Sequence, residues 1–184
     1  MFSQFKSVLS FSFLLLLLGL SFSKSYAAPQ KSLIQKITPQ LTVPFKFKDI
    51  NNRDINLTDY KGQWVLVNFW APWCPICMTE IPTLNELNSF DNIIVLGMAM
   101  DYGPDQSVVV NKINSTNMNY TAHILGGSRR DPDSPYRQVG PVDFFPTSYL
   151  YSPTGEIVMF IPGQIRKNKI ADFIQKYQTK IVKK

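Results

Sequence analysis

The sequence predicts a single α/β domain whose sheet contains parallel strands. Two short runs of apolar β-formers, WVLVNFW at 64–70 and NIIVLGMAM at 92–100, suit strands that are covered on both faces. A segment with helical spacing follows each run, and this alternation is typical of parallel sheets. With 184 residues, 45% of them hydrophobic, the chain is long enough for one well-buried core and too short for two comfortable domains.

The first 27 residues have the layout of a secretory signal peptide. Lys6 precedes an apolar run from about Val8 to Leu20, and the small-x-small pattern that ends at Ala27 favours cleavage there. The run is shorter than the roughly 20 residues that span a bilayer comfortably, so an uncleaved anchor is the weaker alternative. Residues 28–42 have weak periodicity, as in a linker or arm, and the domain is expected over 43–184.

The elements of this domain are expected in a regular order. Alternation around Asn51 and Asn52 predicts a small β-hairpin before residue 58. Helical spacing predicts a helix over 74–90 with a kink at Pro82, and another helix over 107–117. A short strand is expected at 120–125, a loop with one helical turn at 126–144, and two strands with a turn between them at 146–161. An apolar stripe predicts a last helix over 167–180.

The charge pattern argues against a nucleic-acid partner. The formal charge is +6, and part of it belongs to the leader and to the lysine-rich C-terminus. No basic run interleaves with aromatic residues, as a nucleic-acid surface would require. No coiled-coil heptad is present either, so a monomer is expected.

Cys74 and Cys77 are the two cysteines of the chain. A bridge across so short a loop would remove little entropy from the unfolded state, so the pair is predicted to serve chemistry rather than stability. On the first turn of a helix, Cys74 would lie near unpaired backbone N–H groups that stabilise a thiolate, which makes it the expected nucleophile. Cys77, one turn later and more buried, is the expected resolving cysteine.

A metal site is the competing interpretation of the CxxC motif. Structural zinc needs four ligands, and the only other soft candidate is His123, so no zinc site is expected. Two thiolates, alone or with His123 or a methionine, can hold copper(I), which leaves a copper chaperone as an alternative. His123 itself is better explained as a half-buried strand residue. No resident cofactor is expected.

The run VLVNFWAPWCPICMTEIP, with LTDYKGQ before it and FFPTSYLYSPTGEIV after it, resembles the TlpA/ResA-like thioredoxin family. This family consists of exported thiol:disulfide oxidoreductases and is related to the AhpC/TSA and Redoxin proteins. The match covers about residues 43–177. It implies a thioredoxin fold, with a central mixed β-sheet flanked by helices, an N-terminal β-hairpin and an inserted helix and strand. It also implies that Cys74 and Cys77 form a redox-active disulfide.

The resemblance assigns a client-binding loop to the site. It implies that Pro146 follows a cis peptide bond and faces the CxxC motif, with Phe145 and Thr147 beside it. The backbone of Phe145 would then be free to pair with an extended client segment. Trp73, next to Cys74, is expected on the flat surface around the sulfur.

The resemblance also makes Glu80 an active-site group. Glu80 lies three residues after Cys77, so its carboxyl group can approach the site from the next helical turn and shuttle the Cys77 proton. A solvent-facing helix glutamate is the alternative. Asn68 occupies the strand position where thioredoxin carries a buried Asp, and an amide cannot accept that proton.

The expected function is the reduction of client protein disulfides in the periplasm or another extracytoplasmic space, with inner-membrane anchoring if the leader is retained. The resemblance implies a membrane electron donor of the DsbD or CcdA kind. The dipeptide Pro75-Ile76 lacks the histidine of DsbA-type oxidants, which favours a reductant, while a disulfide oxidase or isomerase stays an alternative. Cytochrome c maturation is a further candidate role, although residues 140–147, GPVDFFPT, lack the acidic residue that such members carry beside the proline.

Overall fold

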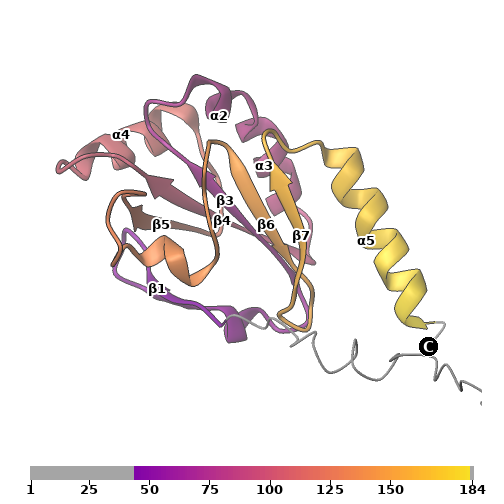
Figure 1. The fold of residues 1–184 in the computed structure, drawn as a ribbon. Coiled ribbons are helices and arrows are strands. Elements are labelled where there is room, and N and C mark those ends of the chain that lie inside the picture. Colours follow the sequence, from indigo (N-terminus) through magenta and orange to yellow (C-terminus); the bar gives the residue numbers. More distant parts are fainter. Residues whose placement is uncertain (1–43, 183–184) are drawn as a thin grey trace, which may run out of the picture. The chain divides into compact units, whose positions relative to one another are not determined.

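The structure is a computed structural model that describes residues 44–182 (Figure 1). The signal peptide and the arm predicted before residue 43 lie outside the described residues. The elements, of which η1 and η2 are 3-10 helices, are β1 (Lys46–Lys48), β2 (Asp54–Asn56), η1 (Leu57–Tyr60), β3 (Trp64–Trp70), α2 (Pro75–Thr79), α3 (Ile81–Asn88), β4 (Ile93–Met100), α4 (Ser107–Thr116), β5 (Ala122–Gly127), η2 (Pro135–Gln138), β6 (Thr147–Tyr151), β7 (Ile157–Pro162) and α5 (Lys167–Val182).

A five-stranded mixed sheet forms the centre of the fold, with the strand order β5-β4-β3-β6-β7. Strand β4 runs parallel to both β3 and β5, whereas β6 runs antiparallel to both β3 and β7. All seven residues of β3 are buried, as its continuous apolar sequence predicts for a central strand. Along the chain, helix α4 and strand β5 follow β4 and precede β6, where an inserted helix and strand were expected. The N-terminal hairpin is the separate two-stranded sheet of β1 and β2.

The sheet separates two hydrophobic clusters, because successive side chains of a strand point to opposite faces. On one face, β3 contributes Trp64, Leu66 and Trp70 to a core shared with α3, α4 and α5. On the other face, Val65, Val67 and Phe69 pack with the hairpin and with the loop around η2. Asn68 belongs by the same alternation to the helix-covered face, on which the two cysteines are also buried.

The helix predicted over 74–90 is two helices, which corrects the expected kink. Glu80 ends α2 and precedes α3, with φ −95° and ψ −7°. Pro82 stands in the first turn of α3, where its missing N–H costs nothing, but it could not donate to the carbonyl group of Met78 in a continuous helix. Glu80, which directly follows the short helix that carries Cys77, is 2% exposed at this break.

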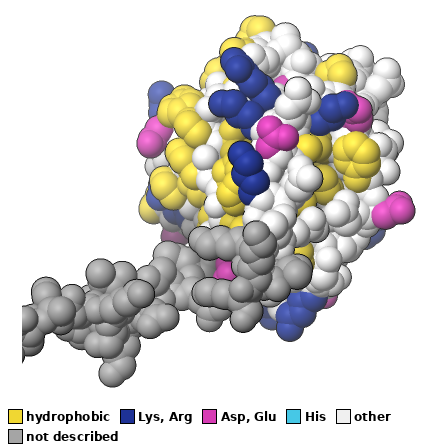
Figure 2. Space-filling model, turned by 90° about the vertical axis from the view of Figure 1, so that its right-hand side faces the viewer, with side chains coloured by type: hydrophobic (Ala, Val, Ile, Leu, Met, Phe, Trp, Pro, Cys, Tyr) yellow, Lys and Arg dark blue, Asp and Glu magenta, His cyan; other side chains and the backbone are white. Residues whose placement is uncertain are grey.

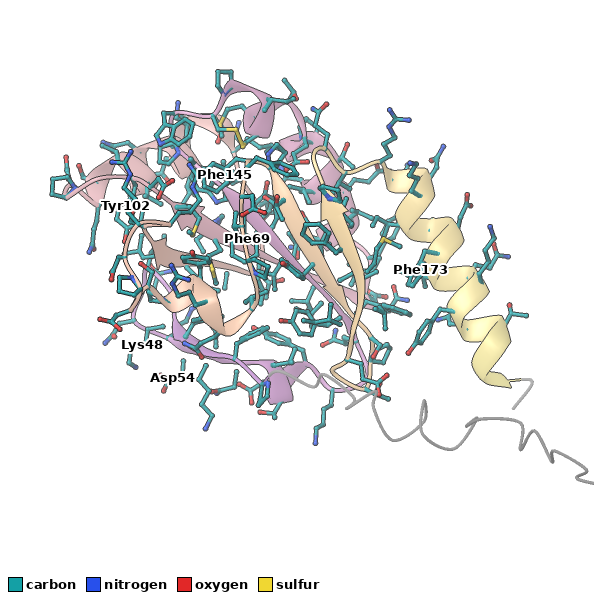
Figure 3. All side chains as sticks on the ribbon, in the orientation of Figure 1. Lys48, Asp54, Phe69, Tyr102, Phe145 and Phe173 are labelled. Carbon is teal, nitrogen blue, oxygen red and sulfur yellow. A yellow bond between two sulfur atoms is a disulfide. The ribbon has the colours of Figure 1, made fainter. Side chains whose placement is uncertain are left out.

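Helix α5 closes the helix-covered face beside β7 (Figure 1). Ile170 and Ile174 are buried in the core, and the ring of Phe173 reaches toward the sheet to meet Trp64 edge to face (Figure 3). The outer surface on this side of the molecule mixes Lys and Arg side chains with hydrophobic ones (Figure 2). Across residues 44–182, no helix has the length and apolar character needed to cross a membrane.

Candidate active site

The two cysteines form a disulfide where the chain passes from β3 to α2. Cys74 is the N-cap residue of α2, and Pro75 occupies the first turn, where a missing N–H is tolerated. The backbone N–H of Cys77 donates a hydrogen bond to Cys74 Sγ over 3.2 Å. The residues that begin the helix therefore also supply a donor to the first sulfur.

Glu80 is held by two hydrogen-bond donors from distant parts of the chain. Asn68 Nδ2 donates to Glu80 Oε1 over 2.8 Å, and the backbone N–H of Ile165 donates to Glu80 Oε2 over 2.9 Å. Asn68 Nδ2 also donates to Ser148 Oγ over 3.0 Å, because the register of β3 and β6 places these two residues opposite each other. The solvent-facing alternative for Glu80 is therefore wrong.

Burial raises the pKa of Glu80, and the hydrogen bonds from Ile165 and Asn68 only partly oppose that rise. Within residues 44–182, no Lys, Arg or His forms an ion pair with this carboxyl group. A buried carboxyl group without a cation is suited to hold a proton at higher pH than an exposed one, and so to exchange protons with a neighbour.

A second loop borders the disulfide. The Phe145–Pro146 peptide bond is cis, as the family resemblance implied, and Pro146 is buried. The ring of Phe145 packs edge to face on Trp73 at a centroid distance of 5.6 Å, so this loop lies beside the residue that precedes Cys74 (Figure 3). Thr147 is 1% exposed, and its hydroxyl group donates to the carbonyl oxygen of Phe144 over 2.8 Å. Its side chain therefore shapes the loop from within.

Exposed apolar side chains lie next to the cysteines in the chain and in the loop that carries Phe145. Trp73 is 57% exposed, Ile76 49% and Phe144 47%. Large hydrophobic side chains on a surface often mark a contact site for another molecule. Trp73 was expected here from its position beside Cys74, whereas Ile76 and Phe144 were not singled out from the sequence.

Asp101 and Arg129 join the two loops. Trp73 Nε1 donates to the carbonyl oxygen of Asp101 over 2.9 Å, and the Asp101 carboxylate accepts from Arg129 N over 2.9 Å and from Arg129 Nε over 2.6 Å. The Arg129 guanidinium also donates to the Asp143 carbonyl oxygen over 2.7 Å and lies 4.5 Å from the centre of the Phe145 ring. This pair, called the Asp101–Arg129 clamp below, fixes both Trp73 and Phe145.

Sequence reasoning missed the clamp, although one signal for it was available. Asp101 directly follows the second buried strand, and β3 and β4 are parallel, so their carboxyl ends meet at the same edge of the sheet. A polar residue at that position is a candidate neighbour for a CxxC motif that follows β3. Arg129 had no such signal, because its position depends on the course of the loop after β5.

The described residues offer little to a metal ion beyond the two sulfurs. Between residues 44 and 182, no three or more His, Cys, Asp or Glu side chains are grouped closely enough to hold one. His123 lies on β5, half-buried, with its ring stacked on Tyr120 at 5.3 Å. This agrees with its interpretation as a sheet residue.

The fold and the paired cysteines define a thioredoxin-fold protein of the thiol–disulfide oxidoreductase class. The AhpC/TSA family model matches residues 34–159. The thiol-disulfide oxidoreductase ResA of Bacillus subtilis (strain 168) is 30% identical over 131 residues, which are 71% of this chain and 70% of ResA. The chain therefore belongs to the AhpC/TSA family and is related to its ResA-like thiol–disulfide oxidoreductases.

Two solved structures are similar in fold. A thiol:disulfide interchange protein of the thioredoxin family from Chlorobium tepidum TLS superposes with a TM-score of 0.59 at 20% identity, covering 72% of this chain and 92% of the other. The pneumococcal exposed lipoprotein thioredoxin Etrx1 from Streptococcus pneumoniae strain TIGR4 superposes with a TM-score of 0.56 at 25% identity, covering 72% of this chain and 98% of the other. The thioredoxin fold expected from the sequence is thereby confirmed.

Proposed function

We propose that this protein reduces disulfides of client proteins outside the cytoplasm, with Cys74 and Cys77 as the working dithiol. The observation that carries the proposal is the Cys74–Cys77 disulfide between β3 and α2, with exposed Trp73 and Ile76 next to the cysteines and the buried carboxyl group of Glu80 at the end of α2. Structural stapling would not need the carboxyl group or the apolar border.

Cys74 is the proposed nucleophile. The hydrogen bond from the Cys77 N–H to Cys74 Sγ would stabilise a thiolate on this sulfur, and a stabilised thiolate is formed at lower pH. Both cysteine residues are nearly buried, with Cys74 4% and Cys77 2% exposed, so exposure does not distinguish them. The hydrogen bond to Cys74 Sγ is therefore the feature that favours Cys74 as the attacking thiolate.

The exchange proceeds in two balanced steps. The Cys74 thiolate attacks one sulfur of the client disulfide, that bond breaks, and the second client sulfur leaves as a thiolate. Cys77 then loses its proton and attacks Cys74 Sγ, which breaks the mixed disulfide and releases the first client sulfur as a thiolate. The client gains two electrons and, after protonation, two thiols, and the protein gains the Cys74–Cys77 disulfide.

Glu80 is the proposed acceptor of the Cys77 proton, and its surroundings support both of its protonation states. The ionised carboxylate accepts from Asn68 Nδ2, as observed. If the Asn68 amide rotates by half a turn, its Oδ1 can accept from a protonated Glu80, and the Ser148 hydroxyl can change from acceptor to donor toward the same oxygen. Asn68 and Ser148 can thus remain hydrogen-bonded before and after the proton moves.

Client docking is proposed on the loop around Pro146. Within residues 44–182, the backbone N–H and carbonyl groups of Phe145 make no hydrogen bond, and Pro146 has no N–H. An extended client segment can pair with such free main-chain groups as an added strand does. Trp73 and Phe145 would supply the apolar contact, while Thr147 supports the loop from inside.

Location and electron supply complete the proposal. We assign residues 1–27 to export, 28–42 to an arm or linker, and 43–184 to the redox domain, which acts as a monomer. The pneumococcal neighbour is an exposed lipoprotein, which supports an extracytoplasmic site of action for this chain. A membrane electron donor of the DsbD or CcdA kind would re-reduce the pair. A role in cytochrome c maturation is not proposed, because the residues on either side of Pro146 are Phe145 and Thr147, where such members carry an acidic residue beside the proline.

Trapping experiments test this function. The wild-type protein is expected to accelerate the reduction of insulin disulfides by dithiothreitol, and Cys74→Ser is expected to abolish the acceleration. Reduced Cys77→Ser should accumulate a mixed disulfide with insulin, visible by mass spectrometry, because the resolving sulfur is absent. A protein that traps no client through Cys74, yet binds one equivalent of copper(I) tightly in its dithiol form, would instead be the copper chaperone.

A further inference from the structure

A groove of about 1000 Å³ opens beside the disulfide. Trp73 forms one of its borders, and the residues that follow β4 and β5 form its walls, together with η2 and the segment at 141–143. Since Trp73 is bonded directly to Cys74, a client segment whose cysteine reaches Cys74 would have its neighbouring residues over this groove. The groove is therefore continuous with the proposed site of exchange.

Arginine side chains dominate the charge of the groove. Its charged lining residues are Arg129, Arg130, Arg137, Asp101 and Asp143. Arg129 and Asp101 neutralise each other in the clamp, with a closest N–O distance of 2.6 Å. Arg130 and Arg137 are exposed and form no ion pair with any side chain in the described range, so they outnumber the one remaining carboxylate, Asp143.

Arg137 is already oriented on the wall. Its guanidinium lies 5.1 Å from the centre of the Tyr136 ring, and it donates to the backbone carbonyl oxygens of Asp131 over 3.2 Å and Arg129 over 3.3 Å. These three contacts restrict the side chain without neutralising its charge. A guanidinium that is held in place and still charged loses less conformational freedom when it binds a carboxylate.

We propose that this groove binds acidic side chains of the client next to the disulfide that is exchanged, with Arg130 and Arg137 as the recognising groups. This inference rests on the proposed function, because it names the class of client that the same site accepts. The preferred client is an extended protein segment with Asp or Glu within a few residues of its cysteine. The apolar side chains around Trp73 then provide contact area, and the two arginines provide specificity for clients with acidic residues.

The test uses two synthetic peptide disulfides that differ only in charge. One carries two Glu residues beside the bridged cysteine, and the other carries two Gln residues at the same positions. The second-order rate constant for reaction with the pre-reduced protein is measured at low ionic strength. We expect the Glu peptide to react about fivefold faster, as two exposed ion pairs would allow, and the preference to vanish near 1 M salt.

Variants then assign the preference to the groove. In the Arg130→Gln, Arg137→Gln double variant, the ratio of the two rate constants should fall to about one, whereas Arg130→Lys, Arg137→Lys should retain most of it because the charges remain. The Lys169→Gln, Lys176→Gln double variant is the matched control, since it removes two positive charges from exposed positions on α5, away from the groove, and should leave the ratio unchanged. Equal rates for both peptides in the wild type, or an equal loss in this control, would overturn the inference.

A separate readout distinguishes failure of the exchange from failure of the recognition. Calorimetric binding of cysteine-free Glu and Gln peptides to the oxidised protein needs no electron transfer. If neither peptide disulfide reacts but the Glu peptide binds more tightly, the proposed function is wrong and the acidic preference stands. If both disulfides react and neither cysteine-free peptide is preferred, the function stands and the acidic preference is wrong.

Discussion

The carboxyl group of Glu80 accepts one hydrogen bond on each of its oxygens, yet it lies in the core without a cation among the residues described. Its environment therefore favours the neutral form more than water does, which is why its pKa is raised. The contribution of Glu80 to folding stability is fully present below the ordinary pKa of Glu in the unfolded chain. It is lost as the pH rises through the raised pKa of the folded state.

Glu80→Gln removes this pH dependence because an amide has no proton to lose. The free energy of unfolding of the oxidised variant should therefore increase relative to that of the oxidised wild type as the pH rises from about 4 to 8. Urea denaturation measures this difference. The same change should slow the resolution of the mixed disulfide by roughly a hundredfold, since a positioned base contributes at least that much.

Glu86→Gln serves as the control for Glu80→Gln. Glu86 lies on α3, the helix that begins directly after Glu80, but it is exposed and forms an ion pair with Lys167 over 2.6 Å. Its replacement should leave both the pH trend and the resolution step close to wild type. Resolution at the wild-type rate in Glu80→Gln between pH 5 and 8 would contradict a proton-accepting role for Glu80.

Among the elements, the loops after β3, β4, β5 and η2 meet beside Trp73 and are joined through the Asp101–Arg129 clamp. Asp101 has a positive φ of 49°, a conformation that Asp tolerates better than most residues. The register shift between β4 and β5 at Met100 brings the Asp101 N–H to the Gly127 carbonyl oxygen, over 2.9 Å. The irregular end of this strand pair therefore aims Asp101 at both Trp73 and Arg129.

Arg129→Ala should destabilise the folded protein by about 1–2 kcal/mol, because it removes charge-assisted hydrogen bonds from a partly buried carboxylate. Partial burial alone would raise the pKa of Asp101, but the hydrogen bonds from Arg129 lower it. This stabilisation is therefore present above the ordinary pKa of Asp and is lost as the pH falls through the lowered pKa of the folded state. Urea denaturation at pH 7 and pH 3 measures both effects.

Arg129→Lys separates the geometry of the clamp from its charge. Lysine keeps the positive charge but cannot span Asp101, the Asp143 carbonyl group and the Phe145 ring at once. We expect the stability of Arg129→Lys to lie between that of the wild type and that of Arg129→Ala. Acrylamide should quench the fluorescence of its Trp73 faster than in the wild type. If Arg129→Ala unfolds at the same urea concentration as wild type at pH 7, the clamp does not hold these loops.

Sequence patterns predicted the elements better than their ends. The strands around residues 64–70 and 92–100 and the last helix were recognisable because apolar periodicity directly reflects burial. The break between α2 and α3 at Glu80 was not recognisable, because a proline indicates a kink or a break in a helix but not which of the two occurs. The depth of Glu80 was equally open, because one helical turn fixes the direction of a side chain and not what covers it.

At the scale of the whole molecule, the sheet has the helices α3, α4 and α5 on one face and the N-terminal hairpin with the η2 loop on the other. Strand β3 is apolar on both sides, so its sequence alone could not assign Trp64 or Phe69 to a face. Pairing with β6 decides what lies opposite Asn68, and that contact joins segments 80 residues apart. The two cysteines could be found from local sequence, whereas the network beneath them required the assembled sheet.

The reduction potential of the Cys74–Cys77 couple decides whether the pair acts as a reducing dithiol. Equilibration of the domain with dithiothreitol or glutathione buffers gives the value, and each 30 mV corresponds to about 1.4 kcal/mol for two electrons. A potential near or below about −250 mV, close to that of thioredoxin, is predicted. A potential near about −120 mV, like that of DsbA, would contradict the account and make the protein an oxidant of its clients.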